Sequence, residues 1–147
     1  MPGTIRIFGL AIFVCLFHGC GGSGDGVANP PGLSTGPADC IGGSAADFAC
    51  SGVSLRARVP LDRMNGTVGN DIWGWFDTTT GNEYALVGMT DGTAFVDVTN
   101  PENPVFLGRL PTQTQSSTWR DIKVYQDHAY VVADNAGAHG MQVFDLT

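Results

Sequence analysis

Two long apolar hairpins constrain the fold of this chain more than any other feature of its sequence. The stretch EYALVGMTDGTAFVDVT, residues 83–99, returns about 45 residues later as HAYVVADNAGAHGMQVFDLT, residues 128–147. β-branched and aromatic side chains are frequent in both stretches, and a turn rich in Asp, Asn and Gly divides each of them. Each stretch therefore predicts two antiparallel strands, and their repetition predicts a fold assembled from similar units.

Further strands complete the two units, and clusters of Gly, Asn, Asp and Pro separate the strands. The predicted strands span residues 70–76, 83–89, 93–99 and 103–110 in the first unit, and residues 120–126, 128–134 and 141–147 in the second. The two units align at Asp71 and Asp121, Ile72 and Ile122, Ala85 and Tyr130, Asp97 and Asp145, and Thr99 and Thr147. The offsets of 50, 45 and 48 residues differ because the first turn is longer in the first unit and the second turn is longer in the second unit.

A unit of four short antiparallel strands that repeats every 45 to 50 residues is typical of a β-propeller blade. A blade lies between two neighbours, so its middle strands read as apolar runs, as YALVGM and AYVVA do. The predicted fold is all-β, with about one and three-quarter blades: a first blade over 70–110 and an incomplete second blade over 119–147. A two-sheet β-sandwich is the alternative, but its strands should alternate more cleanly between apolar and polar residues.

The amino-terminal 39 residues predict export and a tether. Residues 1–19 carry one early positive charge and an apolar run, as an export signal does, and that run is too short to span a bilayer. FHGC, residues 17–20, is similar to a lipobox, which predicts lipidation of Cys20; ordinary secretion is the alternative. Residues 20–39 are rich in Gly, Ser and Pro and predict a flexible tether. We therefore expect a lipoprotein of the outer membrane or cell surface, or otherwise a secreted protein.

Composition and charge limit the function classes. The chain has 147 residues, of which 43% are hydrophobic and 14% charged, so it should bury a core. Removal of residues 1–19 leaves six basic and 14 acidic side chains, a net charge of −8. Because nucleic acid binding needs a basic patch and the basic residues do not cluster, no nucleic acid partner is expected.

Cys40 and Cys50 remain as a pair once the signal is removed. In an oxidising compartment they predict a disulfide within an amino-terminal segment over 40–69, and such a short loop would stabilise the fold by about 2–3 kcal/mol. A metal site is the alternative, but no His lies near either Cys.

Acidic and histidine residues offer a few candidate sites. His128 and His139 flank a turn that contains Asp134, which could suggest a metal site or an acid and base pair, although structural roles are favoured. Asp91, Asp97 and Asp145 lie at turns or strand ends, where a carboxylate commonly accepts backbone N–H groups. No cofactor is expected, and weak calcium binding by such a turn is the alternative.

Three tryptophans are the remaining candidates. Trp73, Trp75 and Trp119 could form a platform for a carbohydrate or a peptide, although aromatic residues in the first strand of a blade more often pack between blades. Together with Asp134 and His139 they are the candidate ligand surface. No motif of a known catalytic class occurs, so no catalytic residue is predicted.

The run CIGGSAADFACSGVSLRARVPL, followed by GNDIWGW, EYALVGMTDGTAFVDVTNPENPVFLGRLP and WRDIKVYQDHAYVVADNAGAHGMQVFDLT, resembles the choice-of-anchor B family of secreted bacterial proteins, which are built from LVIVD repeats. The resemblance covers residues 40–147. It implies a secreted or surface-anchored β-propeller and no catalytic residue. The family's domains contain several repeats, so the resemblance also implies that this chain is a fragment of a longer product.

These observations together predict a binding or scaffolding protein at the cell surface, with a surface protein or a glycan as its partner. The alternative is a fragment of a propeller enzyme, a hydrolase or a quinoprotein-like oxidoreductase, whose active site lies in missing blades. A closed ring typically needs roughly four to eight blades, so further blades would be required for closure. We therefore expect the isolated chain to aggregate or to pack poorly.

Overall fold

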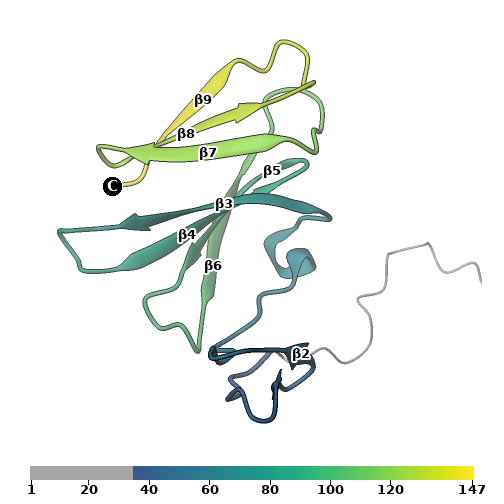
Figure 1. The fold of residues 1–147 in the computed structure, drawn as a ribbon. Helices are drawn as coiled ribbons and strands as arrows, with labels where there is room; N and C mark the ends of the chain where they lie inside the picture. Colours follow the sequence, from purple (N-terminus) through teal and green to yellow (C-terminus); the bar gives the residue numbers. More distant parts are fainter. Residues whose placement is uncertain (1–34) are drawn as a thin grey trace, which may run out of the picture. The chain divides into compact units, whose positions relative to one another are not determined.

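The computed structural model describes residues 35–147. The predictions for the export signal, for Cys20 and for most of the tether concern residues outside this range. The described residues form β-strands and one short 3-10 helix, so the expected all-β class is confirmed (Figure 1). The elements are β1 (Ser44–Ala45), β2 (Phe48–Ala49), η1 (Leu61–Met64), β3 (Gly69–Phe76), β4 (Glu83–Met89), β5 (Gly92–Asp97), β6 (Val105–Pro111), β7 (Arg120–Tyr125), β8 (His128–Ala133) and β9 (Met141–Asp145).

The first predicted unit forms one antiparallel sheet in the order β3-β4-β5-β6. Strands that follow one another in the chain are neighbours in the sheet, as in a propeller blade. The turn between β4 and β5 is tight, and β6 lies very close to it. A Cβ atom at Gly92 would lie 2.6 Å from the carbonyl oxygen of Leu110 and 2.8 Å from Nε of Arg109, so this position requires glycine.

The second predicted unit forms a separate antiparallel sheet in the order β7-β8-β9. Gln126 and Asp127 connect β7 and β8, and their φ angles of 46° and 60° are both positive, as a type I′ hairpin turn requires. Seven strands thus lie where the sequence predicted them, in two sheets of four and three strands. These sheets are compatible with propeller blades.

The alignment of Ala85 with Tyr130 is wrong by one residue. The equivalent cross-strand pairs of the two sheets are Tyr84–Asp97 and His128–Asp145. Ala85 therefore corresponds to Ala129, at an offset of 44 residues. The error matters because a slip of one residue moves a side chain to the opposite face of its strand.

Each sheet has two chemically different faces, which the register defines. Cross-strand pairs share a face and successive residues alternate between faces. One face carries Ile72, Ala85 and Val87 in the first sheet and Ile122, Ala129 and Val131 in the second; we call it the Ile-Ala-Val face. The opposite face carries Asp71 in the first sheet and Asp121 in the second; we call it the Asp face.

The two sheets stack with the Ile-Ala-Val face of the second on the Asp face of the first, and β7 contacts β3 and β4 (Figure 1). Ile122, Ala129 and Val131 are fully buried in this interface, as is Leu86 of the first sheet, and Phe95 of the first sheet is 9% exposed. Removing these side chains from water stabilises the stack by about 1.5–3 kcal/mol for each large one. The Asp face of the first sheet therefore meets the Ile-Ala-Val face of the second. The two sheets thus have the same orientation along the stack.

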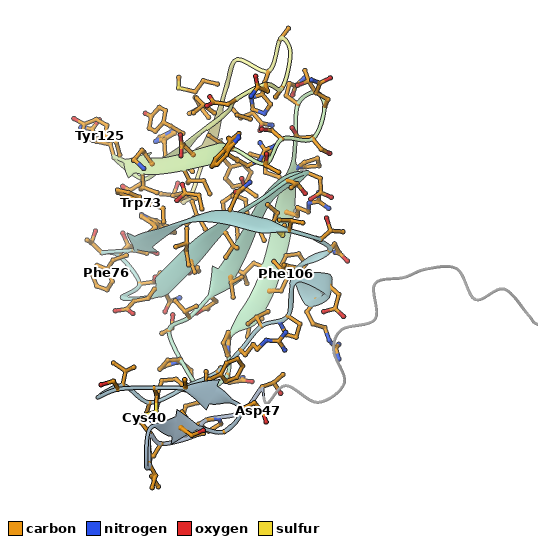
Figure 2. All side chains as sticks on the ribbon, turned by 45° about the vertical axis from the view of Figure 1, so that its right-hand side comes forward. Cys40, Asp47, Trp73, Phe76, Phe106 and Tyr125 are labelled. Atoms are coloured by element: carbon orange, nitrogen blue, oxygen red, sulfur yellow. A yellow bond between two sulfur atoms is a disulfide. The ribbon has the colours of Figure 1, made fainter. Side chains whose placement is uncertain are left out.

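A polar contact fixes the same interface at its edge. The Oδ2 atom of Asp71 accepts a hydrogen bond of 2.8 Å from the backbone N–H of Ile122. Trp73 lies beside it between the sheets (Figure 2), where the Lys123 ammonium group sits 4.2 Å from the centre of its ring. A cation over an indole contributes about 0.5–1 kcal/mol at an exposed site.

The segment before β3 covers part of the other face of the first sheet. Val59, Leu61 and Met64 pack against Ala94 and Val96 of β5 in a second small core. The first sheet therefore has apolar neighbours on both faces. In the second sheet, the described residues bury only the Ile-Ala-Val face.

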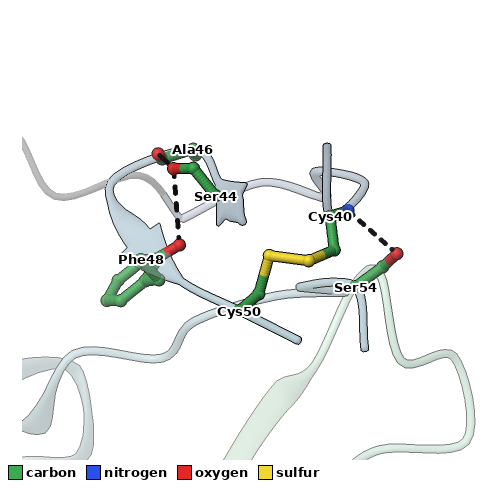
Figure 3. Close-up of a disulfide and its surroundings, with 6 residues drawn as sticks. All are labelled: Cys40, Ser44, Ala46, Phe48, Cys50 and Ser54. Atoms are coloured by element: carbon green, nitrogen blue, oxygen red, sulfur yellow. Dashed lines mark hydrogen bonds between the residues drawn. A yellow bond between two sulfur atoms is a disulfide. The ribbon is translucent and has the colours of Figure 1, made fainter. Parts of the chain in front are cut away.

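The predicted disulfide is confirmed: Cys40 and Cys50 are bonded, with their Cα atoms 5.9 Å apart (Figure 3). The bond closes a small loop that contains β1 and β2, which pair with each other through Ser44 and Ala49. The backbone N–H of Cys40 also donates to the Ser54 hydroxyl at 3.3 Å. A segment with so few apolar residues depends on this crosslink for its order.

Candidate binding surface

Three of the residues singled out in the sequence come together at one end of the two sheets. Trp119 closes the loop between β6 and β7, and Asp134 and His139 belong to the loop between β8 and β9. The N–H of Asp134 donates to the carbonyl of Trp119 at 2.9 Å, and the Ser117 N–H donates to the carbonyl of Thr90 at 2.8 Å. We call this region, which comprises residues 90–91, 112–119 and 134–140, the loop end.

Arg120 holds the loop end together, and the sequence interpretation did not single it out. It is 1% exposed, and its Nε atom donates to the carbonyl of Met89 at 2.9 Å. Its guanidinium also donates to the carbonyl of Thr90 at 3.4 Å. Burial lowers the pKa of Arg120, and the negative charge of Asp91 opposes this effect. Strand alternation could have revealed it, because Arg120 shares the inward face with Ile122.

His139 is a structural residue of this cluster. It is 6% exposed, and its Nε2 atom lies 3.3 Å from a guanidinium nitrogen of Arg120. Because arginine can only donate, Nε2 accepts this bond, so Nδ1 carries the proton and donates to the carbonyl of Gly140 at 3.0 Å. His128 lies apart from it and bonds to the carbonyl of Gln126 at 2.7 Å. Among residues 35–147 no three His, Cys, Asp or Glu side chains group as a metal site would need.

Asp91 forms an ion pair rather than the expected turn contact. Its Oδ2 atom lies 2.7 Å from Nη2 of Arg109. The Arg109 guanidinium also donates two hydrogen bonds of 2.6 Å, from Nη1 to the carbonyl of Asn65 and from Nη2 to the carbonyl of Asp91. Within the described part of the chain, Oδ1 of Asp91, Oγ1 of Thr93 and Nε of Arg109 are buried without a hydrogen-bond partner. The pair therefore ties β6 to the β4–β5 turn but leaves polar atoms unsatisfied.

Asp97 and Asp145 do form the predicted turns. The Thr99 N–H donates to Asp97 at 2.9 Å, and the Thr147 N–H donates to Asp145 at 3.0 Å. Hydrogen bonds from Thr99, first from its hydroxyl and then from its N–H, lower the pKa of Asp97. Hydrogen bonds from the N–H and then the hydroxyl of Thr147 lower the pKa of Asp145. The equivalent ends of two sheets thus share one turn chemistry. The alternative of weak calcium binding stays a prediction.

A polar hollow of about 270 Å³ lies within the loop end. Its lining consists of hydroxyl and amide residues without a formal charge: Thr90, Ser116, Ser117, Thr118 and Asn135. Trp119 follows this lining directly in the chain and is 65% exposed. The expectation that Trp119 packs between blades is therefore wrong, because the strand that follows it buries Arg120 instead.

The other two tryptophans lie on the first sheet, away from Trp119. Trp75 stacks on Tyr84 with a ring-centre distance of 5.0 Å, and its indole N–H donates to Asp127 at 3.0 Å. Trp75 therefore packs between the sheets, as aromatic residues in a first strand commonly do. Trp73 is 38% exposed and contacts Lys123. The three indoles do not form one platform.

An apolar cavity of about 280 Å³ opens between the outer strands of the two sheets. Its walls come from both sheets and are Trp75, Tyr84, Leu86, Phe95, Leu107, Gly108, Arg109, Phe144 and Leu146. The first sheet has β6 as its fourth strand at this side, whereas β9 is the last strand of the second sheet.

Comparisons of the chain with known protein families, with curated proteins and with solved structures found no match. No helix among residues 35–147 has the length and apolar character needed to cross a membrane.

Proposed function

We propose that this chain is an exported, lipid-anchored cell-surface protein of the LVIVD-repeat type, that its sheets are β-propeller blades, and that it binds a glycan at the loop end. The propeller is supported by the stacking of unlike faces, which lets a third unit continue the series in the same orientation. The export is supported by the disulfide, since such bonds persist in oxidising compartments.

The choice of a glycan as the ligand rests on the residues that line the loop-end hollow. Its hydroxyl and amide groups can exchange hydrogen bonds with sugar hydroxyls, and it presents no charged lining residue that would require an ionic ligand. The exposed indole of Trp119 lies next to it in the chain, and aromatic faces pack well against the apolar faces of sugar rings. The extended loops that form this end are the usual location of binding residues.

A glycan array followed by calorimetry tests the ligand. The labelled, exported chain should bind a set of neutral glycans, and Trp119→Ala should weaken that binding about tenfold. Trp73→Ala is the matched control, because Trp73 lies on the first sheet outside the loop end, and it should bind normally. Equal affinities of the two variants, or the absence of glycan binding, would contradict the proposal. Turnover of a bound glycan would favour the enzyme alternative.

The anchor has its own test. Mass spectrometry of the mature protein from a bacterial envelope should find an amino-terminal Cys20 that carries acyl chains. Cys20→Ser should release the chain into the soluble fraction. A mature amino terminus elsewhere, without lipid, would show that the chain is secreted in the ordinary way and would leave the glycan proposal standing.

A further inference from the structure

The Asp face of the second sheet carries an open group of apolar side chains beside Asp121, Lys123 and Asp145. Tyr125, Val132, Met141 and Val143 share this face by register, and between 40% and 65% of each side chain is exposed. Figure 2 shows Tyr125 projecting from the end of this sheet. An apolar group of this kind on a sheet face marks an interaction site more often than a bare surface.

The Ile-Ala-Val face of the first sheet is open along β3. The segment before β3 covers this face at β5, where Met64 packs on Ala94 and Val96. At β3, however, Ile72 is 63% exposed and Phe76 is 54% exposed. A hollow of about 500 Å³ lies beside them. Within residues 35–147, the Asp face of the second sheet is therefore open, whereas the Ile-Ala-Val face of the first sheet is open only along β3.

Residues at these two open surfaces are equivalent to residues that already meet inside the chain. The Ile-Ala-Val residues are identical in both sheets, and those of the second sheet are fully buried against an Asp face. Asp71 and Asp121 are likewise equivalent, and Asp71 binds the N–H of Ile122 at this interface. Trp75 and Tyr125 are both aromatic at equivalent positions. The internal interface thus serves as a template for a second one.

We propose that a second copy of this chain docks the β3 side of its first sheet on the Asp face of the second sheet. In this contact Asp121 accepts the backbone N–H of Ile72 from the other copy, as Asp71 accepts that of Ile122. The interface is heterologous, so copies join head to tail and form a ring where the rotation closes. This inference does not depend on the glycan proposal.

Sedimentation velocity of the exported chain over a range of concentrations tests the contact. The wild type should associate, whereas Ile72→Glu and Val143→Glu should each stay monomeric up to about 0.1 mM. An equimolar mixture of the two variants should form a species of two copies and nothing larger, because each partner retains one intact face. Because both side chains are exposed, the introduced glutamates are not buried in the folded chain and do not prevent folding.

Matched variants separate this contact from unspecific association. Val53→Glu, at a residue that is 69% exposed and belongs to neither face, should associate like the wild type. Phe76→Glu and Met141→Glu form a second pair that should reproduce the mixing result. A monomeric wild type overturns the proposal, and so does association of Ile72→Glu by itself, since that would indicate contact between two Asp faces. A mixture that stays monomeric overturns it as well.

Discussion

The two sheets share their strand order, their register and the Asp–Thr turn after the third strand, yet they are stabilised differently. The first sheet has apolar neighbours on both faces, whereas the described residues cover only one face of the second sheet. Ile72 and Ile122 show the contrast best, because one is 63% exposed and the other is fully buried at equivalent positions. Local sequence thus determines the shape of a unit, and the neighbouring unit determines what each residue contributes to stability.

The largest expected effect comes from Ile122. Ile122→Ala should lower the free energy of unfolding by about 3 kcal/mol, because it leaves a cavity in the core between the sheets. The matched change Ile72→Ala should cost about 0.5 kcal/mol, since that side chain is largely exposed. Urea unfolding followed by circular dichroism measures both at a concentration where the chain is monomeric. Equal losses at the two positions would break the comparison between the sheets.

The second-largest effect is expected at Arg120. Arg120→Met keeps much of the side-chain volume but leaves the carbonyls of Met89 and Thr90 without a donor, which should cost about 2 kcal/mol. Arg56→Met removes an exposed ion pair with Glu102 and should cost less than about 1 kcal/mol. The same unfolding experiment checks both variants. A smaller loss at Arg120 than at Arg56 would show that the loop end does not link the sheets.

Asp71 and Asp121 test the same comparison at the edge of the interface between the sheets. Asp71→Ala removes the acceptor for the N–H of Ile122 and should cost about 1.5 kcal/mol. Asp121→Ala should cost close to nothing in the monomer, because this carboxylate is exposed. Amide hydrogen exchange provides the direct measurement, since the Ile122 amide should lose its protection in Asp71→Ala alone. Protection that persists there would argue against this bond.

The smallest effect concerns pH. The pKa of Asp145 lies below its usual value of 3.8 in the folded chain, because Thr147 donates hydrogen bonds to its carboxylate. The ionised form therefore stabilises the fold above pH 3.8, and this stability is lost as the pH falls through the lowered pKa. In Asp145→Asn, the free energy of unfolding should fall less between pH 6 and pH 3 than it does in the wild type. The same pH dependence in the variant and the wild type would show that the ionised Asp145 contributes nothing to stability.

Strand positions could be predicted well because they depend on local patterns. Runs such as YALVGM and turns such as Thr90–Asp91 encode their conformation in neighbouring residues, so seven strands were placed within a few residues of their bounds. The disulfide was predictable for a similar reason, since Cys40 and Cys50 lie close in the chain. The misalignment of Ala85 with Tyr130 shows the limit, because register depends on pairing between strands rather than on one strand.

The candidate site was predictable only in part. Asp134, His139 and Trp119 do gather at the loop end. His139 is buried and has the structural role that was favoured, whereas Trp119 is exposed and not packed between blades as expected. His139 is buried against Arg120, which reaches the turn of the other sheet. Such a contact joins residues 31 positions apart, and no local pattern encodes it.

The sequence by itself determined the class of structure, the strand units and the disulfide, because backbone propensity, turn chemistry and short loops act over a few residues. Only the tertiary structure decided which face of each sheet is covered, which of two equivalent isoleucines is buried and where the loops form a hollow. These outcomes depend on contacts between sheets, and the free energy of burial is realised only when distant surfaces come together.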